Sequence, residues 1–197
     1  MNLALFDFDG TITTKDSFID FVKFIKGKKV TYAGLVLFVP LLALMKLKLL
    51  SNGKVKQKVF SYFFKGESLQ DIQVKVKQYV EKSLPKMLKK SALDRIQYHK
   101  AQGDRIVLVS ASLDLWLEEW TKSEGIELIC TKIEVDSEGR VTGRFSSPNC
   151  YGQEKVNRIK MLLDVHKYEK IYAYGDSRGD REMLQLAVKP YFKRFNK

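Results

Sequence analysis

Three short apolar segments, each followed at once by a polar side chain, most strongly limit the folds open to this chain. They are residues 3–7 (LALFD), 105–110 (RIVLVS) and 170–176 (KIYAYGD). Each segment has the length and composition of a buried strand, and helical patterns lie between them. Strands that alternate with helices build a parallel sheet, and the carboxyl ends of parallel strands meet at one edge. We therefore expect an α/β fold with a Rossmann-like parallel sheet whose edge collects Asp7, Ser110 and Asp176.

The stretch between the first two of these strands is purely helical in its apolar spacing. We expect four helices there, over 16–29, 33–48, 54–64 and 69–83. Pro40 would kink or split the second of them. The chain then divides into an α/β catalytic core, 1–14 and 86–197, and a helical cap, 15–85, inserted after the first strand. Residues 132–145 alternate apolar and polar side chains, which predicts a short β-hairpin flap.

Two acids follow the first strand, in the sequence Asp7-Phe8-Asp9-Gly10-Thr11. Acids at this spacing lie close together, and Gly10 permits a tight turn whose backbone N–H groups face a phosphate. The repulsion between the acids favours a divalent cation, and Mg²⁺ prefers oxygen ligands and substrate phosphate. A carboxylate also serves as a covalent phosphoryl acceptor. Taken alone the motif is ambiguous, because paired acids at strand ends also cap helices or bind structural ions.

Three further signals are weaker one by one. Asp176 and Asp180 follow another strand, where Asp180 is also explained as a helix-capping or first-turn acid. Ser110 offers a hydroxyl and neighbouring N–H groups to a phosphate oxygen, although serine is common at strand ends. Lys155, at the start of a helix, would neutralise a nucleophile and a phosphate, although a lysine is usually exposed.

Together, the order and placement of these four motifs resemble the haloacid dehalogenase (HAD) superfamily of phosphohydrolases over essentially the whole chain. DFDGT and GDSRGD are the specific motifs, and Ser110 and Lys155 support them. The helical insertion before Ser110 is similar to the cap of subfamily IB, which contains phosphoserine phosphatase. The resemblance implies a HAD fold and a Mg²⁺-dependent hydrolase of phosphate monoesters.

The resemblance also implies a role for individual residues. Asp7 would attack phosphorus and form an aspartyl-phosphate, while Asp9 would protonate the leaving alcohol and then activate water. Mg²⁺ would be held by Asp7, the backbone carbonyl of Asp9 and Asp176, with Asp180 acting through metal-bound water. Lys155 would complete the catalytic group. The residues expected to hold phosphate and substrate are Thr11, Ser110, Ala111 and Asp16.

Phosphoserine phosphatases differ from this chain at three points. They carry Glu at the position of Asp16, and a helix N-cap explains Asp16 equally well. They use a cap arginine to hold the substrate carboxylate, and no arginine lies between Met1 and Asp94 here. They usually have Asn at the position of Gly179. Phosphoserine is therefore an alternative substrate.

Residues 34–50 and the motif CYGQEKV, 150–156, resemble a second branch of the subfamily, which includes the bacterial phosphatidylglycerophosphatase C type. Its substrate class would be a phospholipid phosphate, and a phosphorylated small metabolite stays equally open. The uncharged residues 34–45 are too few to span a bilayer, which takes about 20. With lysines on both sides they could rest on an acidic membrane surface. The competing explanation is a helix in the cap core or a dimer contact.

Positive charge is concentrated in one segment. The chain holds 35 Lys/Arg and 23 Asp/Glu, and residues 15–100 hold 19 of the former and 6 of the latter. This favours anionic partners, although a solubilising lysine face explains it as well. The alternative from another class is a basic protein that binds nucleic acid or acidic lipid without turnover, but no nucleic-acid motif is recognisable. Two cysteines and no signal-peptide pattern favour the cytoplasm, with a peripheral position on the inner membrane face as the variant.

Overall fold

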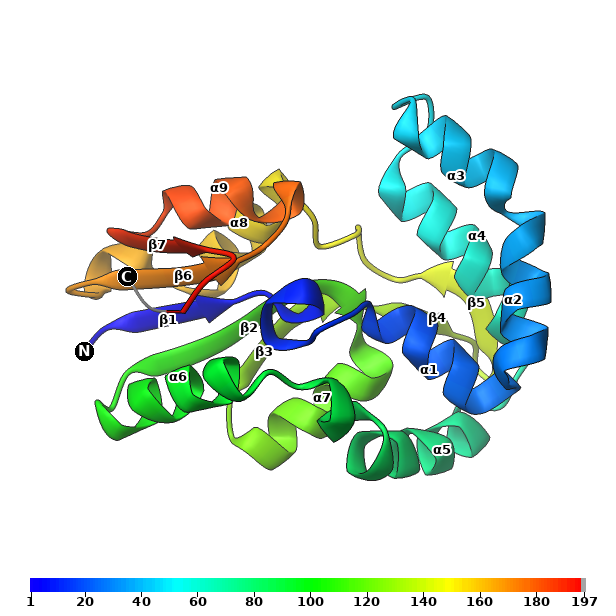
Figure 1. The fold of residues 1–197 in the computed structure, drawn as a ribbon, viewed down its shortest axis with the longest axis horizontal. Coiled ribbons are helices and arrows are strands. Elements are labelled where there is room, and N and C mark those ends of the chain that lie inside the picture. The colour runs from blue at the N-terminus through cyan, green and yellow to red at the C-terminus, as the bar shows by residue number, and fades with distance from the viewer. Residues whose placement is uncertain (196–197) are drawn as a thin grey trace.

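The computed structural model describes residues 1–195, which form a sheet covered by helices on both faces and a group of helices beyond one end (Figure 1). Five parallel strands make up the sheet, in the order β3-β2-β1-β6-β7. Their bounds are β1 Leu3–Phe6, β2 Arg105–Leu113, β3 Glu127–Thr131, β6 Ile171–Gly175 and β7 Lys189–Phe192. The expected parallel α/β sheet is confirmed.

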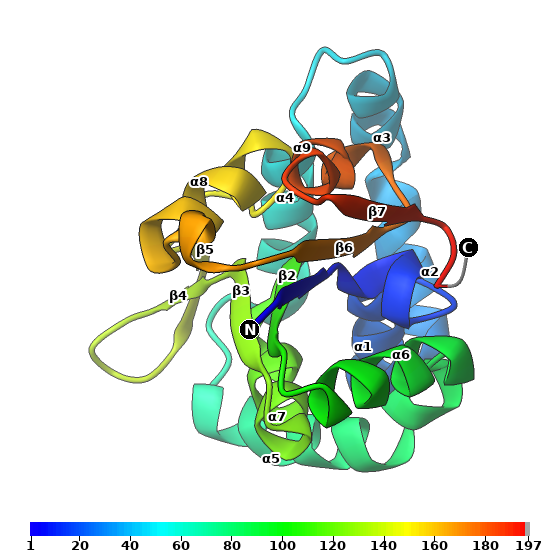
Figure 2. The same ribbon diagram turned by 90° about the vertical axis from the view of Figure 1, so that its left-hand side faces the viewer.

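The central strand β1 is buried on both sides because helices cover both faces of the sheet (Figure 2). The helices of the two layers are α6 Lys90–Ala101 and α7 Asp114–Glu124 on one face, and α8 Gln153–Leu162 and α9 Arg181–Gln185 on the other. Ala4 and Phe6 of β1 pack into the first layer and Leu3 and Leu5 into the second. This alternation follows from the period of two along a strand.

Five helices between β1 and β2 lie in residues 15–85, which we call the helical insertion. They are α1 Ser17–Lys26, α2 Lys28–Leu37, α3 Val39–Lys46, α4 Asn52–Phe64 and α5 Leu69–Lys82. The helix expected over 33–48 is two helices, because the chain bends by 58° between α2 and α3. The break falls just before Pro40, which lacks an N–H and fits only the first turn of a helix. Of the two outcomes expected at Pro40, splitting is observed.

The expected hairpin is confirmed as β4 Ile133–Val135 and β5 Val141–Phe145, paired antiparallel. It packs on the helical insertion. The ring of Phe145 lies 5.6 Å from that of Phe60 in α4, and the Phe145 N–H donates to Gln57 Oε1 at 3.1 Å. Because β4 follows β3 closely, the hairpin ties the insertion to the sheet at a point far from β1.

Among residues 1–195, no single helix is long and apolar enough to cross a membrane. The bent pair α2–α3 reaches the required length and composition when its two helices are taken together. Short helical turns occupy Phe8–Ile12, Leu84–Met87, Val165–Lys167 and Arg178–Asp180.

Candidate active site

Asp7 follows β1 directly and stands at the carboxyl edge of the sheet. Its N–H donates to the carbonyl of Tyr174 in β6 at 2.9 Å, so the strand pairing still holds this residue in place. The chain then turns at Gly10, where φ is +78°, and a side chain there would overlap the carboxylate of Asp176. Glycine is needed for both the left-handed backbone and the close approach of Asp176.

Lys155 lies in the first turn of α8 and is only 1 % exposed, unlike most lysines. Its ammonium donates to Asp7 Oδ1 at 2.7 Å, to Asp180 Oδ1 at 2.6 Å and to the Val109 carbonyl at 2.7 Å. Burial opposes the charged form, but Asp7 and Asp180 raise the pKa of Lys155 above its usual value. A fixed positive charge therefore lies beside Asp7 in the interior of the protein.

Asp180 organises the loop after β6. Its Oδ2 accepts hydrogen bonds from the N–H of Asp176 at 3.2 Å and from the N–H and hydroxyl of Ser177 at 2.9 and 2.8 Å. Gly175 leaves the space for it, because a side chain there would press on Asp180. Burial opposes its charge, but Lys155 holds the pKa of Asp180 below its usual value. Of the structural roles considered for Asp180 in the sequence, that of a first-turn acid is observed, in a capping box with Ser177.

Asp7, Asp176 and Asp180 offer carboxylate oxygens that lie within 4.8 Å of one another. Burial raises the pKa of Asp7 to about 7, although Lys155 pulls it down. Burial and then Asp180 raise the pKa of Asp176. Both directions indicate that the protein alone does not fully compensate these charges. A hard cation with oxygen ligands supplies such compensation, so the cluster fits the Mg²⁺ expected from the sequence.

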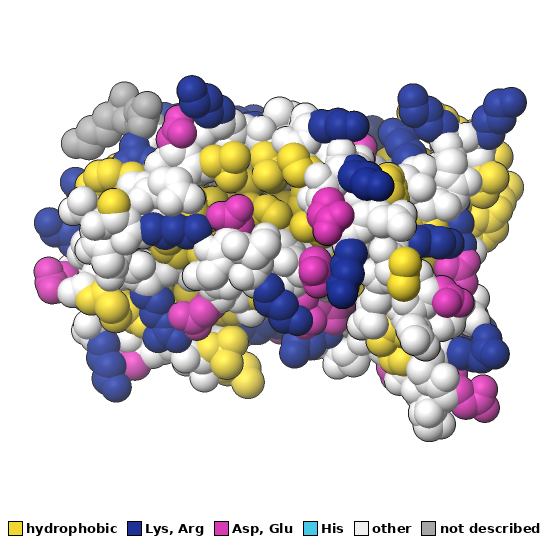
Figure 3. All heavy atoms as spheres, turned by 90° about the horizontal axis from the view of Figure 1, so that it is seen from below, with side chains coloured by type: hydrophobic (Ala, Val, Ile, Leu, Met, Phe, Trp, Pro, Cys, Tyr) yellow, Lys and Arg dark blue, Asp and Glu magenta, His cyan; other side chains and the backbone are white. Residues whose placement is uncertain are grey.

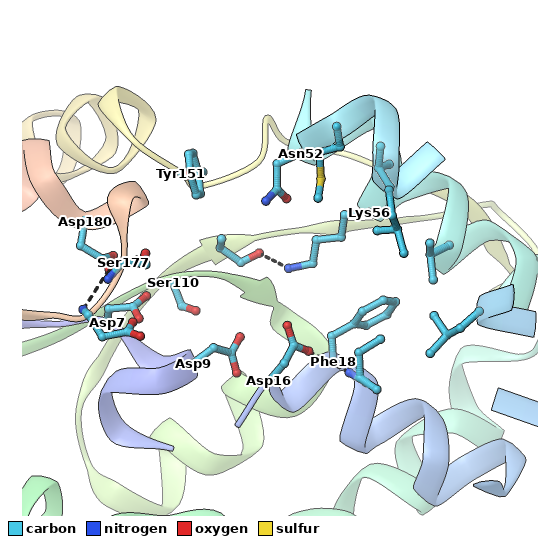
Figure 4. A pocket seen from close by; sticks show the side chains of 18 of the residues that line it. Asp7, Asp9, Asp16, Phe18, Asn52, Lys56, Ser110, Tyr151, Ser177 and Asp180 are labelled. Carbon is cyan, nitrogen blue, oxygen red and sulfur yellow. Dashed lines mark hydrogen bonds between the residues drawn. The ribbon is translucent and has the colours of Figure 1, made fainter. Parts of the chain in front are cut away.

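Asp9 turns its carboxyl group away from this cluster and toward the helical insertion. Its Oδ1 accepts the N–H of Ser17, the first residue of α1, at 2.7 Å, and its Oδ2 accepts the hydroxyl of Ser112 in β2. Burial, followed by the nearby Asp16, raises the pKa of Asp9. Figure 4 shows its side chain between those of Asp7 and Asp16. Metal binding by its backbone carbonyl stays a prediction.

Ser110 and Ala111, two of the residues expected to hold phosphate, line the cavity beside Asp7 (Figure 4). The Ser110 hydroxyl accepts the N–H of Ser112 at 3.0 Å within β2. The pairing of β2 with β3 shifts register after Ser110, so regular strand geometry ends where the cavity begins. The Ser110 hydroxyl is thus held by Ser112 at the point where β2 meets the cavity.

The other two expected residues are placed differently. Thr11 is buried and donates its hydroxyl to Asp176 Oδ1 at 3.4 Å, so it supports the carboxylate cluster and does not line the cavity. Asp16 does line the cavity, and its carboxylate also caps α1 by accepting the N–H of Ile19 at 2.9 Å. The N-cap interpretation of Asp16 is confirmed, and contact with substrate stays a prediction.

The cavity above these residues has a volume of 780 Å³ and joins two unlike surfaces. The sheet edge contributes carboxylates and Lys155, and the helical insertion contributes an apolar wall. The side chains of this wall are Phe18, Ile19, Tyr32, Leu35, Val36, Val39, Leu42, Met45, Val55 and Val59. A pocket with one polar end and one apolar wall suits a ligand that carries a charged group on an organic body.

Lys56, one of the lysines that flank the apolar residues 34–45, is a further candidate that was not predicted as a site residue. It reaches from α4 into the cavity and donates to the Ala111 carbonyl at 2.7 Å (Figure 4). Burial lowers the pKa of Lys56, while Asp9 and Asp16 oppose that shift. Its spacing of three and four residues from the buried Val59 and Phe60 places it on the inward face of α4, a signal readable in the sequence.

Comparison with other proteins agrees with this arrangement. The sequence model of the family of haloacid dehalogenase-like hydrolases matches residues 4–185 of this chain. Protein CicA of Caulobacter vibrioides is 32% identical over 196 residues, which cover 98% of this chain and 86% of that protein.

Solved structures give the same result for the fold. A Bordetella pertussis Tohama I protein of unknown function has a TM-score of 0.82 and 23% identity, over 96% of this chain and 88% of the other. A phosphoserine phosphatase in the form of a phospho-aspartyl intermediate analogue has a TM-score of 0.67 and 16% identity, over 94% and 83%. The matched regions include both the carboxylate cluster and the helical insertion. This chain therefore belongs to the family of haloacid dehalogenase-like hydrolases.

Proposed function

We propose that this protein is a Mg²⁺-dependent phosphatase that hydrolyses a phosphate monoester through an aspartyl-phosphate on Asp7. One observation carries the proposal. The buried Lys155 binds one oxygen of Asp7 at the polar end of the cavity, and a carboxylate oxygen of Asp176 lies within 4.8 Å of a carboxylate oxygen of Asp7, close enough for both to bind one metal ion. Membership of the hydrolase family supports it. The fold similarity to a phosphoserine phosphatase in a phospho-aspartyl form agrees with it.

The proposed first step transfers the phosphoryl group to the protein. An oxygen of Asp7 attacks phosphorus while the bond from phosphorus to the alcohol oxygen of the substrate breaks. Lys155 keeps Asp7 in place and offsets negative charge as the two anions meet. Mg²⁺, when bound by Asp7 and Asp176 with Asp180 behind them, would supply further charge neutralisation for the phosphate.

Asp9 would move the protons of both steps. It first gives a proton to the leaving alcohol oxygen, and it then takes a proton from the water that attacks the aspartyl-phosphate. That attack breaks the bond between phosphorus and Asp7, releases inorganic phosphate and restores protonated Asp9. The hydrogen bonds from Ser17 and Ser112 hold both of its oxygens, so its orientation is set before substrate arrives.

The apolar wall of the cavity indicates which class of substrate the site would accept. Ten apolar side chains of the insertion line the cavity, which favours a phosphate whose alcohol carries an apolar group, such as a phospholipid headgroup phosphate. Phosphoserine is the second candidate, because Asp16 and Lys56 bring one negative and one positive charge to the same cavity. These would suit the ammonium and carboxylate groups of an amino acid.

The test is Mg²⁺-dependent phosphate release from phosphoserine, sugar phosphates, nucleotides, lysophosphatidic acid and phosphatidylglycerol phosphate. We expect Asp7→Asn to lower turnover of the preferred substrate by about 10³-fold or more, because the amide is a poor nucleophile. Asp71→Asn, which changes an exposed aspartate of α5, is the matched control and should leave turnover unchanged.

The substrate order separates the candidates. Preference for the two lipid phosphates supports the apolar assignment, and preference for phosphoserine replaces it with the amino-acid assignment. Turnover that survives Asp7→Asn contradicts the proposed nucleophile. No metal-dependent turnover on any compound, with salt-sensitive binding of an oligonucleotide, would favour the basic binding protein instead.

A further inference from the structure

The bent pair α2–α3 and the turn after it expose apolar side chains and lysines together. No residue of α3 is buried, and the leucines of the following turn reach 69 % exposure. From Phe21 to Gly66 the sequence holds ten lysines and neither Asp nor Glu. We call the following exposed residues the elbow surface: Lys28, Lys29, Val30, Leu37, Leu44, Lys46, Leu47, Lys48 and Leu49.

One face of the molecule that the structure shows differs from this in its charges. Figure 3 shows the face seen from below, where Lys and Arg side chains lie beside Asp and Glu across the surface. Mixed charge of this kind is typical of a solvated protein surface. The elbow surface has one sign of charge and a group of large apolar side chains, and such exposed patches mark interaction sites. Solubility alone explains the lysines but not the leucines.

We propose that the elbow surface docks on an anionic lipid bilayer, with α2 and α3 lying in the headgroup region. Leucines such as Leu37 and Leu47 would enter the boundary with the acyl chains. Lysines at both ends of the helix pair would meet lipid phosphates. The bilayer would contact both the leucines and the lysines of this surface, since an interfacial helix combines burial of apolar area with attraction to acidic lipids.

Other occupants match only half of the surface. A second copy of this chain, docked symmetrically, would bring lysines against lysines with no acid from residues 21–66 to compensate. A nucleic acid would satisfy the lysines but leave the leucines in water. The complementarity of charge and apolar area therefore selects the anionic bilayer.

The same two helices also line the cavity with other side chains, namely Leu35, Val39, Leu42 and Met45. Docking through the elbow surface would thus place the apolar wall of the cavity next to the lipid phase. The proposal goes beyond the proposed function and does not depend on it, because membrane binding is measured without turnover. If both hold, the substrate is one that resides in a membrane.

The test is co-sedimentation of the full chain with vesicles of phosphatidylcholine alone and with vesicles in which about one third is phosphatidylglycerol. We expect binding to the anionic vesicles that weakens as salt is raised. The variant Leu37→Ser/Leu47→Ser/Leu49→Ser should weaken it by about tenfold or more, and Lys46→Gln/Lys48→Gln by about tenfold. None of these residues lines the cavity, so the fold and the site should be retained.

The matched control changes exposed apolar residues elsewhere, in Met161→Ser/Leu162→Ser/Val188→Ser. It should bind vesicles like the unchanged protein, and thermal unfolding checks that all variants are folded. The proposal is overturned if the unchanged protein fails to prefer anionic vesicles, or if control and elbow variants lose binding equally. Binding of an oligonucleotide that the leucine variant leaves unaffected, without vesicle binding, would assign the surface to nucleic acid.

Discussion

The sheet edge and the helical insertion meet at one cavity but hold their side chains in different ways. At the sheet edge Lys155 is buried, and all three of its hydrogen bonds go to fixed partners. In the insertion, Lys56 is half-buried, with a hydrogen bond to one carbonyl, that of Ala111. The helix α3 buries none of its side chains, whereas β1 buries all of them.

This difference separates two tasks. Chemistry at phosphorus needs charges fixed before the substrate arrives, and the packed sheet edge provides them. Recognition of the organic group tolerates adjustment, and an apolar wall that is formed in part by the exposed helix α3 permits it. We therefore expect substitutions at the sheet edge to affect turnover and stability, and substitutions in the insertion to affect mainly substrate affinity.

Among the variants that compare the two regions, Lys155→Met should have the largest effect. It leaves the buried carboxylates of Asp7 and Asp180 without their shared cation, which should lower the free energy of unfolding by about 3 kcal/mol or more. Turnover should fall by about 10²- to 10³-fold, because charge at the phosphoryl group loses a fixed partner. Urea unfolding and single-turnover kinetics measure the two losses.

The control for this variant is Lys160→Met, at an exposed position of the same helix. It should leave both quantities nearly unchanged. If Lys155→Met kept normal turnover, Lys155 would be a structural residue only. The expectation that residues of the sheet edge control turnover would then be wrong.

Lys56→Gln should have a smaller effect of a different kind. We expect a fall of about tenfold in kcat/KM, carried mostly by KM, because Lys56 lies on the substrate side of the cavity. Stability should change little, since a half-buried lysine is replaced by a side chain that can still donate to the Ala111 carbonyl. Lys58→Gln, at an exposed position of α4, is the control. A loss confined to kcat would place Lys56 with the catalytic groups instead.

The sequence predicts the sheet edge better than the insertion. Asp7, Ser110 and Asp176 were expected at one edge because strand ends in a parallel sheet must meet there, and the register of β1 with its neighbours places them so. That reasoning is local. The apolar spacing of α4 indicates that Lys56 lies on its inward face. Lys56 was still missed as a site residue, because the sequence pattern does not give the distance between α4 and the sheet edge.

The same limit explains two other results. The bend at Pro40 was expected, but its angle depends on what α2 and α3 pack against. Contact of Thr11 with phosphate stays a prediction, and its hydroxyl donates to Asp176, whose close approach is permitted by Gly10. Side-chain direction at a turn is set by such tertiary contacts, so motif position alone is not enough to derive it.

Leu42→Ser tests the apolar wall. If this wall holds the organic group of the substrate, KM should rise about fivefold for a lipid phosphate, from the loss of one apolar contact, and hardly at all for a small polar phosphate. Leu41→Ser is the matched control, because Leu41 is half-buried on the same helix but belongs neither to the cavity lining nor to the elbow surface. Equal effects on both substrates would mean that the wall serves packing and not recognition.

The smallest effect is expected at His99, which is buried near the end of α6 and does not line the cavity. Its ring nitrogens lie 2.7 Å from Asp104 Oδ2 and 2.9 Å from the Tyr174 hydroxyl. Burial lowers the pKa of His99, although Asp104 opposes this. Between that lowered pKa and the unfolded value of about 6.5, the unfolded chain binds more protons than the folded one. Stability should therefore fall as the pH falls below about 6.5.

His99→Gln should remove this contribution and flatten the pH dependence below about pH 6.5, by at most about 1.4 kcal/mol per pH unit. Chemical unfolding at several pH values measures the slope, and His166→Gln, at an exposed histidine, should keep the slope of the unchanged protein. Turnover at a fixed pH should be the same in both variants, because His99 does not line the cavity. A change in turnover with no change in slope would mean that the packed core transmits more to the site than its contacts indicate, and rigid packing would then be part of catalysis as well as of stability.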